Sequence, residues 1–326
     1  MNLLLRIVIL FTAINTTVLP VSAQMWKAVE PENLPVKRLE NAMAEANGKL
    51  YLLGGRDIKS VDEYDPKKNT WVSLSATPIE MSHFQAISFH GEIYVVGAFT
   101  GGYPHETPIP NIYIFNPDKN EWRKGPEIPE NRRRGAAGAF VLDDKIYIVC
   151  GIQDGHWDGQ VAWLDEYDPA KNTWKQLADA PRKRDHIQVA VVDNKLYVAG
   201  GRLSTARINQ VLNTTIAEVD VYDFKTGKWE TPDPSNNIPT KRAGNTTVVL
   251  GHKVLFIGGE SDAHVEAHNE VEAFNTHTQK WEKYPSMLQG RHGTQAVSMH
   301  KKVYIAAGSG NRGGGPELNT LEVLED

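Results

Sequence analysis

One short pattern recurs six times along this chain and constrains its fold more than any other feature. Each copy is an apolar segment that ends in two small residues, and successive copies are about 50 residues apart. The small-residue pairs are Gly54-Gly55, Gly97-Ala98, Cys150-Gly151, Gly200-Gly201, Gly258-Gly259 and Ala307-Gly308. A period of this length indicates an array of similar structural units, although the chain length alone would suggest two domains.

A second pattern follows each of the first five copies. It consists of an aromatic residue, a polar turn and a tryptophan seven positions after the aromatic residue. The pairs are Tyr64 and Trp71, Phe115 and Trp122, Tyr167 and Trp174, Tyr222 and Trp229, and Phe274 and Trp281. The turns between them contain Asp, Pro and Asn, which hairpin loops favour. Each unit is therefore predicted to be a run of short antiparallel strands.

The sixth copy lacks its tryptophan, because the sequence ends at Asp326 soon after a strand predicted over residues 318–324. Trp26 can supply it, since Trp26 is followed by Leu34-Pro35, much as other copies carry an apolar-proline pair after their tryptophan. Pairing the two ends of a circular array removes exposed strand edges. We therefore predict an all-β fold, a six-bladed β-propeller of four-stranded antiparallel blades over residues 24–326, closed by the N-terminal strand in the last blade.

Three of the repeated segments also resemble a known family. The words LLGG at residues 52–55, VAGG at 198–201 and FIGG at 256–259, with the aromatic residue and tryptophan that follow, are similar to the Kelch repeat. The resemblance extends over residues 24–326 and implies the propeller fold. It does not imply one activity, because the same scaffold serves as adaptor, structural protein and enzyme.

The first 23 residues have the organisation of a secretory signal peptide. Arg6 precedes the apolar run at residues 7–13, and Val21-Ser22-Ala23 offers small residues where signal peptidase cuts. A buried N-terminal strand is the alternative interpretation. No later stretch approaches the ~20 apolar residues of a membrane span. We therefore expect a mature, exported domain with no membrane span.

Cysteine content and charge narrow the setting further. Cys150 is the single cysteine, so no intramolecular disulfide can form, and export without disulfides fits a periplasmic or secreted bacterial protein. The 35 Lys and Arg against 40 Asp and Glu leave a net charge of −5, which argues against a general nucleic-acid-binding protein.

Arginine stands at the start of the predicted innermost strand in five of the six units. These positions, at a fixed distance before each small-residue pair, are Arg38, Met81, Arg134, Arg184, Arg242 and Arg291. Because blades are related by rotation, equivalent positions form a ring, and we expect the guanidinium groups to line the central funnel. There they suit a carboxylate or phosphate. The alternative is that they tie blades together through carboxylates and carbonyls.

Neighbouring positions add candidates at the same opening. Two residues beyond the arginines lie Glu40, His83, Ala136, His186, Gly244 and Gly293, and four beyond lie the neutral hydrogen-bonding residues Gln85, Gln188, Thr246 and Gln295. Arg202 and Glu260 each follow a glycine pair in the same register, which places both on one rim, and His292 follows Arg291. We include His83, His186, Arg202 and His292 in the predicted ligand-binding set.

Two long loops carry further polar and aromatic side chains. The loop after Glu260 contains His264 and His268, whose spacing suits a metal on a helix, but no helix is expected there, so no metal site is predicted. His156 and Trp157 in the third unit offer flat faces on which a sugar ring could stack. Long insertions on one face of a repeat array are often its binding loops.

The resemblance to Kelch proteins suggests two classes of function. Kelch adaptors that bind acidic peptides use arginines at the start of innermost strands, which resembles the pattern here, so we expect an exported module that binds an acidic small molecule, glycan or peptide without a cofactor. The alternative is an enzyme, since the periplasmic sialic acid epimerase or mutarotase group is similar in size, signal peptide and blade number. That resemblance implies Glu260 as the proton-transfer residue. Arg202, Arg242 and Arg291 would then hold the carboxylate, with His186 or His292 assisting.

Overall fold

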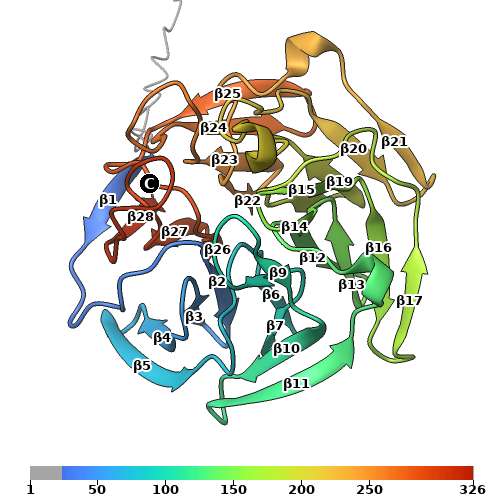
Figure 1. The fold of residues 1–326 in the computed structure, drawn as a ribbon. Helices are drawn as coiled ribbons and strands as arrows, with labels where there is room; N and C mark the ends of the chain where they lie inside the picture. The colour runs from blue at the N-terminus through green and yellow to red at the C-terminus, as the bar shows by residue number, and fades with distance from the viewer. Residues whose placement is uncertain (1–23, 326) are drawn as a thin grey trace, which may run out of the picture.

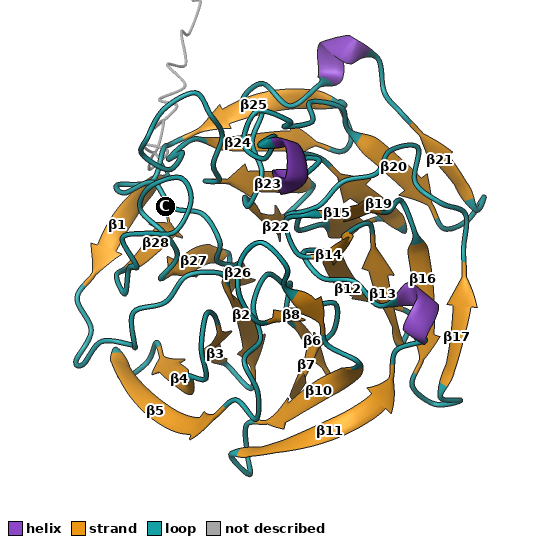
Figure 2. Ribbon diagram, viewed as in Figure 1, coloured by secondary structure: helices purple, strands orange, loops and turns teal. Residues whose placement is uncertain are grey.

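Six four-stranded antiparallel sheets surround a central axis, as Figure 1 shows. The computed structural model describes residues 24–325, and the predicted signal peptide lies outside the described residues. Figure 2 shows that strands and loops make up nearly all of this chain, with short 3-10 turns at Glu130–Arg132, Ala206–Ile208 and Pro234–Asn236. The predicted all-β propeller is confirmed. Within this region no helix is long and apolar enough to cross a membrane.

Every blade has the same antiparallel order from the axis outward. Blade 1 consists of β2 (Asn41–Ala46), β3 (Lys49–Gly54), β4 (Ser60–Asp65) and β5 (Thr70–Ala76). Blade 2 consists of β6 (Ile87–Phe89), β7 (Glu92–Val95), β10 (Asn111–Asn116) and β11 (Glu121–Glu127). Blade 3 consists of β12 (Gly138–Leu142), β13 (Lys145–Val149), β16 (Leu164–Asp168) and β17 (Thr173–Gln176).

The remaining blades continue the circle. Blade 4 consists of β18 (Ala190–Val192), β19 (Lys195–Val198), β20 (Asp220–Asp223) and β21 (Lys228–Glu230). Blade 5 consists of β22 (Thr246–Leu250), β23 (Lys253–Ile257), β24 (Val271–Asn275) and β25 (Lys280–Tyr284). Blade 6 consists of β26 (Ala296–Met299), β27 (Lys302–Ala306), β28 (Leu321–Glu325) and β1 (Met25–Val29).

Two small hairpins lie outside the blades. They are β8 (Phe99–Thr100) with β9 (Thr107–Pro108), and β14 (Ile152–Asp154) with β15 (Asp158–Gln160). Each is inserted between the second and third strands of its blade, after the small-residue pair. These insertions carry Tyr103 and His156, which contribute to the cavity described below.

The N-terminal strand closes the ring as predicted. β1 pairs antiparallel with β28, with Trp26 opposite Leu324. The Trp26 side chain is buried, and its Nε1 donates a hydrogen bond to the Pro285 carbonyl at 2.9 Å. The five other predicted aromatic pairs also lie directly opposite one another on the third and fourth strands, with ring centroids 4.9–5.3 Å apart.

A closed ring of backbone hydrogen bonds encircles the axis where the innermost strands begin. Each of six N–H groups donates to the carbonyl of the preceding blade at 2.8–3.1 Å. The donors are His83, Ala136, His186, Gly244, Gly293 and Asn41, and the acceptors are Glu40, His83, Ala136, His186, Gly244 and Gly293. The six acceptor residues all have φ between 50° and 61°. This left-handed conformation is costly for residues other than glycine, so the ring constrains the positions of Glu40, His83 and His186.

Beyond this ring, buried glutamines hold the blades together across the axis. Gln85 of blade 2 accepts hydrogen bonds from the backbone N–H groups of Ala139 and Val189, both at 3.0 Å. The side-chain amides of Gln85, Gln188 and Gln295 also donate through Nε2 to backbone carbonyls, those of Val189, Thr294 and Ala86 respectively. These predicted neutral hydrogen-bonding residues therefore link blades around the axis.

Candidate functional site

The five repeated arginines are buried inside the blades and paired with carboxylates. Each lies at the start of its blade and reaches an acidic residue on the third strand of the same blade, at 2.5–2.7 Å. The pairs are Arg38 with Asp62, Arg134 with Asp165, Arg184 with Asp220, Arg242 with Glu272, and Arg291 with Glu322. All five guanidinium side chains are fully buried.

Blade 4 illustrates how these arginines are held. Nη1 of Arg184 donates to the carbonyls of Gly200 and Glu218 at 2.9 and 3.3 Å, while Nη2 contacts Asp220. The guanidinium group thus joins the end of β19 to the segment leading into β20. In blade 2 the equivalent Met81 is also fully buried.

The predicted placement of Arg38, Arg134, Arg184, Arg242 and Arg291 around the funnel is therefore corrected by the structure. The rotational equivalence was right, but every guanidinium group has a carboxylate and carbonyls within its own blade. A buried charge needs such partners, because desolvation of an unpaired ion is costly. None of the five is among the residues that line the central cavities.

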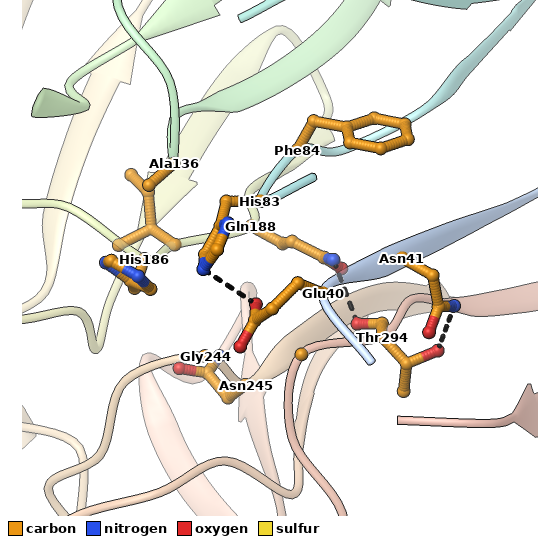
Figure 3. A pocket seen from close by; sticks show the side chains of 12 residues that line it. Glu40, Asn41, His83, Phe84, Ala136, His186, Gln188, Gly244, Asn245 and Thr294 are labelled. Carbon is orange, nitrogen blue, oxygen red and sulfur yellow. Dashed lines mark hydrogen bonds and ion pairs between the residues drawn. The ribbon is translucent and has the colours of Figure 1, made fainter. Parts of the chain in front are cut away.

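A cavity of about 690 Å³ lies at the end of the axis where the long loops gather. Every blade contributes to its wall, mostly from loops that follow the small-residue pairs. It is lined by Leu39, Glu40, Arg56, His83, Gly102, Tyr103, His156, Arg202, Val211, Leu212, Glu260, Gly313, Gly314 and Glu317. Beneath it, the innermost ring encloses a much smaller space lined by Glu40, His83, His186 and their neighbours, which Figure 3 shows.

Arg202 and Glu260 form a buried ion pair in the wall of the large cavity. Nη1 of Arg202 contacts the Glu260 carboxylate, and its Nε donates to Ser204 Oγ at 2.9 Å. The other Glu260 oxygen accepts from the Gly313 N–H at 2.7 Å and lies 3.5 Å from His292 Nε2. Burial raises the pKa of Glu260, but His292, Arg202 and the Gly313 N–H outweigh burial and lower the pKa to about 2.

A second group of charges joins blades 1, 2 and 3. The Glu106 carboxylate contacts Arg56 Nη2 at 2.6 Å and His156 Nδ1 at 3.0 Å. Burial raises the pKa of Glu106, but hydrogen bonds from His156 and Arg56 and their positive charges lower it to about 2. Arg56 also donates to the Gly101 carbonyl at 3.0 Å. The Glu106 carboxylate therefore orients both Arg56 and His156 at the cavity wall.

Three imidazole rings meet between the two cavities. The ring centroids of His83 and His156, and of His83 and His186, are 5.1 Å apart, and those of His156 and His186 are 4.6 Å apart. Burial, aided by neighbouring positive groups, lowers the pKa of both His83 and His186 well below the ordinary value, so these rings are neutral at neutral pH. Glu40 Oε2 lies 3.4 Å from His83 Nε2, which Figure 3 marks with a dashed line.

Comparison with known proteins settles the family. Residues 101–308 match the sequence profile described as the KLHDC2/KLHL20/DRC7 Kelch-repeats domain, and residues 37–78 match the Kelch motif. This chain belongs to the Kelch repeat family. The sequence-based resemblance to Kelch proteins is confirmed.

Several curated proteins are similar to most of this chain. Kelch-like protein terF from Aspergillus terreus (strain NIH 2624 / FGSC A1156) is 25% identical over 90% of this Kelch chain and 66% of its own length. Human Kelch-like protein 38 is 26% identical over 79% of the chain and 42% of its length. Beta-scruin from Limulus polyphemus is 27% identical over 90% of the chain and 34% of its length. The chain thus spans less than two thirds of each of these relatives.

One solved structure has closely similar architecture. The structure titled "Structure of YjhT" aligns with a TM-score of 0.75 and covers 91% of this chain and 100% of that one, at 17% sequence identity. A likeness at this identity supports the fold and carries no information on activity.

The other predicted site residues lie around the two central cavities of this Kelch propeller. His83, Arg202 and Glu260 line the large cavity, and His186 lines the small one. His292 lies behind Glu260 and is 3.8 Å from Glu40. The loop residue His264 is exposed, and its ring packs against that of the buried His268 at 4.5 Å.

Of the two residues predicted to offer flat faces for a sugar ring, only one lines the cavity. His156 lines the cavity, but the Trp157 ring packs on His105, with centroids 4.6 Å apart. Tyr103, from the insertion in blade 2, provides the exposed aromatic face instead and packs against His156 at 5.1 Å. Its side chain is 62% exposed, which leaves one face of the ring available at the cavity mouth.

Sequence reasoning missed Arg56 and Glu106. Arg56 follows Gly54-Gly55 just as Arg202 follows Gly200-Gly201, so the register that identified Arg202 also identifies Arg56. Glu106 lies in the hairpin inserted in blade 2, just before β9, and no repeat position marks it. Its role follows from its contacts with Arg56 and His156 alone.

Proposed function

We propose that the large cavity of this Kelch propeller binds a small ligand through a carboxylate group, as on an acidic sugar or the side chain of an acidic peptide. The observation that carries this proposal is the state of Arg202. Within residues 24–325 its Nε and Nη1 are engaged by Ser204 and Glu260, whereas Nη2 forms no hydrogen bond. A guanidinium group that is only 2% exposed and keeps a free donor at a cavity wall favours an anionic acceptor there.

The size and lining of the cavity support a compact ligand. A volume of about 690 Å³ falls within the range of small-molecule sites and accommodates one or two sugar rings. The exposed ring of Tyr103 offers a face for stacking, while Leu39 and Leu212 add apolar surface. Arg56, from blade 1, also lines the cavity and adds a second positive group to it.

Acid–base catalysis by Glu260 is less well supported than binding. The sequence-based alternative assigned proton transfer in a sialic acid epimerase or mutarotase to this residue. However, a carboxylate whose pKa is lowered to about 2 is a weak base at neutral pH, and efficient general bases have a pKa near the working pH. Both Glu260 oxygens are also occupied, one by the ion pair with Arg202 and the other by a hydrogen bond from the Gly313 N–H. The pair is better suited to orienting Arg202 than to removing a proton.

Export is part of the same proposal. A signal peptide over residues 1–23 would deliver the propeller to the periplasm or the medium, where acidic glycans and peptides are available as ligands. Fractionation of a producing bacterium tests this step, since the mature protein is expected outside the cytoplasm and lacking residues 1–23. Retention of the full-length chain in the cytoplasm would contradict it.

Calorimetric titration tests the binding proposal. N-acetylneuraminate and a short acidic peptide serve as probes, and the methyl ester of N-acetylneuraminate serves as the matched ligand without the charge. Saturable binding of either acid, absent with the ester and weakened by salt, is expected because the contact is electrostatic. Equal binding of acid and ester, or no binding of either acid, would contradict the proposal.

A variant pair assigns the binding to this cavity. Arg56→Gln removes a positive group from the cavity wall, whereas Arg123→Gln removes an exposed arginine that pairs with Glu92 on the outer part of blade 2. We expect weaker binding in the first variant and unchanged binding in the second. Proton NMR of sialic acid anomers tests the enzymatic alternative, since accelerated interconversion that Glu260→Gln abolishes would favour catalysis.

A further inference from the structure

We infer that His83, His156 and His186 form a binding site for a divalent transition-metal ion, with Zn²⁺ or Co²⁺ as suitable probes. The three residues come from consecutive blades: His83 and His186 precede the innermost strands of blades 2 and 4, and His156 lies in the hairpin inserted in blade 3. This site goes beyond the proposed carboxylate binding and does not depend on it. It also departs from the sequence-based expectation of no metal, which considered only His264 and His268.

The arrangement of the rings matches a three-histidine site. One ring nitrogen from each histidine lies within 4.8 Å of the other two. Imidazole binds Zn²⁺ with a Zn–N distance of ~2.0–2.1 Å in tetrahedral geometry, which places ring centroids roughly 5 Å apart. The observed centroid separations of 5.1, 5.1 and 4.6 Å lie close to that value. Around one tetrahedral ion the three nitrogens would lie roughly 3.3 Å from one another.

Hydrogen bonds hold all three rings through Nδ1, and the carboxylate partners of His156 and His186 keep the proton there, which is the tautomer that a metal requires. Nδ1 of His83 bonds Ser82 Oγ at 3.0 Å, Nδ1 of His156 bonds the Glu106 carboxylate at 3.0 Å, and Nδ1 of His186 bonds Asp185 Oδ1 at 2.5 Å. Partners on Nδ1 are the usual support of metal-binding histidines, because they leave the Nε2 lone pair free and hold the ring in place. All three rings are supported in this way.

Two of the free nitrogens are buried without a partner. Nε2 of His83 and Nε2 of His186 are inaccessible to solvent and have no hydrogen-bond partner among the described residues. Buried polar atoms of this kind are rare and need an explanation, since each one costs free energy. A metal ion shared by these nitrogens and His156 satisfies them together.

The surrounding charges favour a cation. Glu40 lies 3.4 Å from His83 Nε2, and its carboxylate contacts only the imidazoles of His83 and His292 among the charged groups described. Asp185 and Glu106 add negative charge behind two of the rings. The nearby guanidinium groups, Arg56 and Arg202, are each paired with a carboxylate, so their repulsion of a metal ion is offset. Because His83 and His156 also line the large cavity, the metal site adjoins the space proposed for the ligand.

Two other clusters of possible ligands provide a comparison. His264, His268 and Glu270 lie together near blade 5, but both ring nitrogens of His268 are already engaged, by Ser261 and Glu270. Asp193, His252 and His277 are all exposed. Neither surface cluster has three buried, oriented imidazoles with free nitrogens, so the central cluster is the one we assign to the metal.

The test is metal binding by protein treated with EDTA and dialysed. Titration with Zn²⁺ by calorimetry, and with Co²⁺ by its visible absorption, is expected to show one tight ion per chain with the absorption of tetrahedral nitrogen coordination. His186→Ala should abolish this binding, and Glu106→Gln should weaken it by ~10–100-fold through loss of ring orientation. The matched control His264→Ala is expected to leave it unchanged.

Two measurements keep the inference falsifiable if a variant is unstable. Circular dichroism of each metal-free variant checks folding before titration, and anomalous diffraction from a wild-type crystal soaked in Zn²⁺ locates the ion directly. Density between the three Nε2 atoms would support the site. An ion found only at the surface clusters, or equal affinity and stoichiometry in wild type and a folded His186→Ala variant, would overturn it. Since no acidic ligand is used, failure here leaves the carboxylate proposal unaffected.

Discussion

Two sets of arginines in this propeller are equally buried but serve different purposes. Arg184 and its four equivalents repeat from blade to blade, and each pairs with a carboxylate and backbone carbonyls inside its own blade, away from the residues that line the cavities. Arg202 is not part of such a ring, since only blade 1 has an arginine, Arg56, at the equivalent position, where the other blades have Phe99, Ile152, Glu260 and Ser309. It retains a free donor at the cavity wall.

The difference shows how a repeat protein separates stability from function. A residue that recurs in most blades has a structural role common to all of them. Here the arginine joins the inner strands of its blade to the third strand. A residue that departs from the repeat is free to vary and is where a site can be built. The following predictions test this distinction.

The largest effect is expected from breaking a pair inside a blade. Arg184→Met leaves Asp220 buried, with the partly exposed Arg182 as its one remaining cationic partner, and should lower the free energy of unfolding by about 3–5 kcal/mol. Urea denaturation measures the change. The double variant Arg184→Met/Asp220→Leu removes both charges and should recover part of the loss. A single variant as stable as the wild type would show that the pair is dispensable.

Protonation of Glu260 should also lower the free energy of unfolding, but only at acidic pH. The folded pKa of about 2 lies below the unfolded value near 4.5, so the stabilisation is present above pH 4.5 and is lost as the pH falls toward 2. The shift corresponds to on the order of 3 kcal/mol. Thermal unfolding between pH 2 and 6 should therefore fall less steeply in Glu260→Gln than in wild type. Glu127→Gln, at an exposed site, is the matched control, and identical slopes in all three would contradict the assignment.

A smaller effect, on binding rather than on stability, is expected at the cavity mouth. Tyr103→Ala removes a ring that is 62% exposed, so the free energy of unfolding should change by less than ~0.5 kcal/mol. Affinity for the acidic ligand should fall by ~3–10-fold, since aromatic contacts contribute about 1 kcal/mol. Calorimetry on Tyr103→Ala and Tyr103→Phe separates the ring from its hydroxyl group. Unchanged affinity in the alanine variant would remove Tyr103 from the site.

The smallest effect is expected at an ion pair on the surface. Lys27 pairs with Glu325 at 2.9 Å on the outer strands of blade 6, where its side chain is 46% exposed. Lys27→Ala should change the free energy of unfolding by less than ~1 kcal/mol, because solvent screens exposed pairs. A loss as large as that of Arg184→Met would mean that burial does not separate the two classes of pair.

The sequence predicted the fold almost completely. Repetition of the small-residue pairs gave the number of blades, and the missing sixth tryptophan identified Trp26 as the closing strand, which pairs with β28. Both follow from patterns that each blade must satisfy to pack against its neighbours. The same periodicity correctly placed His83, His186, Arg202 and Glu260 around the axis.

The site was predicted less well, for a physical reason. Equivalent positions on a ring share a radius and height, but the direction of a long side chain depends on its partners. The carboxylates on the third strands, such as Asp62 and Asp220, draw the arginines into the blades, and no position-by-position comparison of arginines alone reveals them. Glu106 lies in the loop of the hairpin inserted in blade 2, so its contact with Arg56 and His156 depends on loop conformation.

A crystal structure with bound N-acetylneuraminate tests the central claim most directly. The account predicts the ligand in the large cavity, with its carboxylate within hydrogen-bond distance of Arg202 Nη2, and with the five arginine–carboxylate pairs of the blades unchanged. A carboxylate bound instead by Arg38, Arg134, Arg184, Arg242 or Arg291, with those pairs opened, would contradict it.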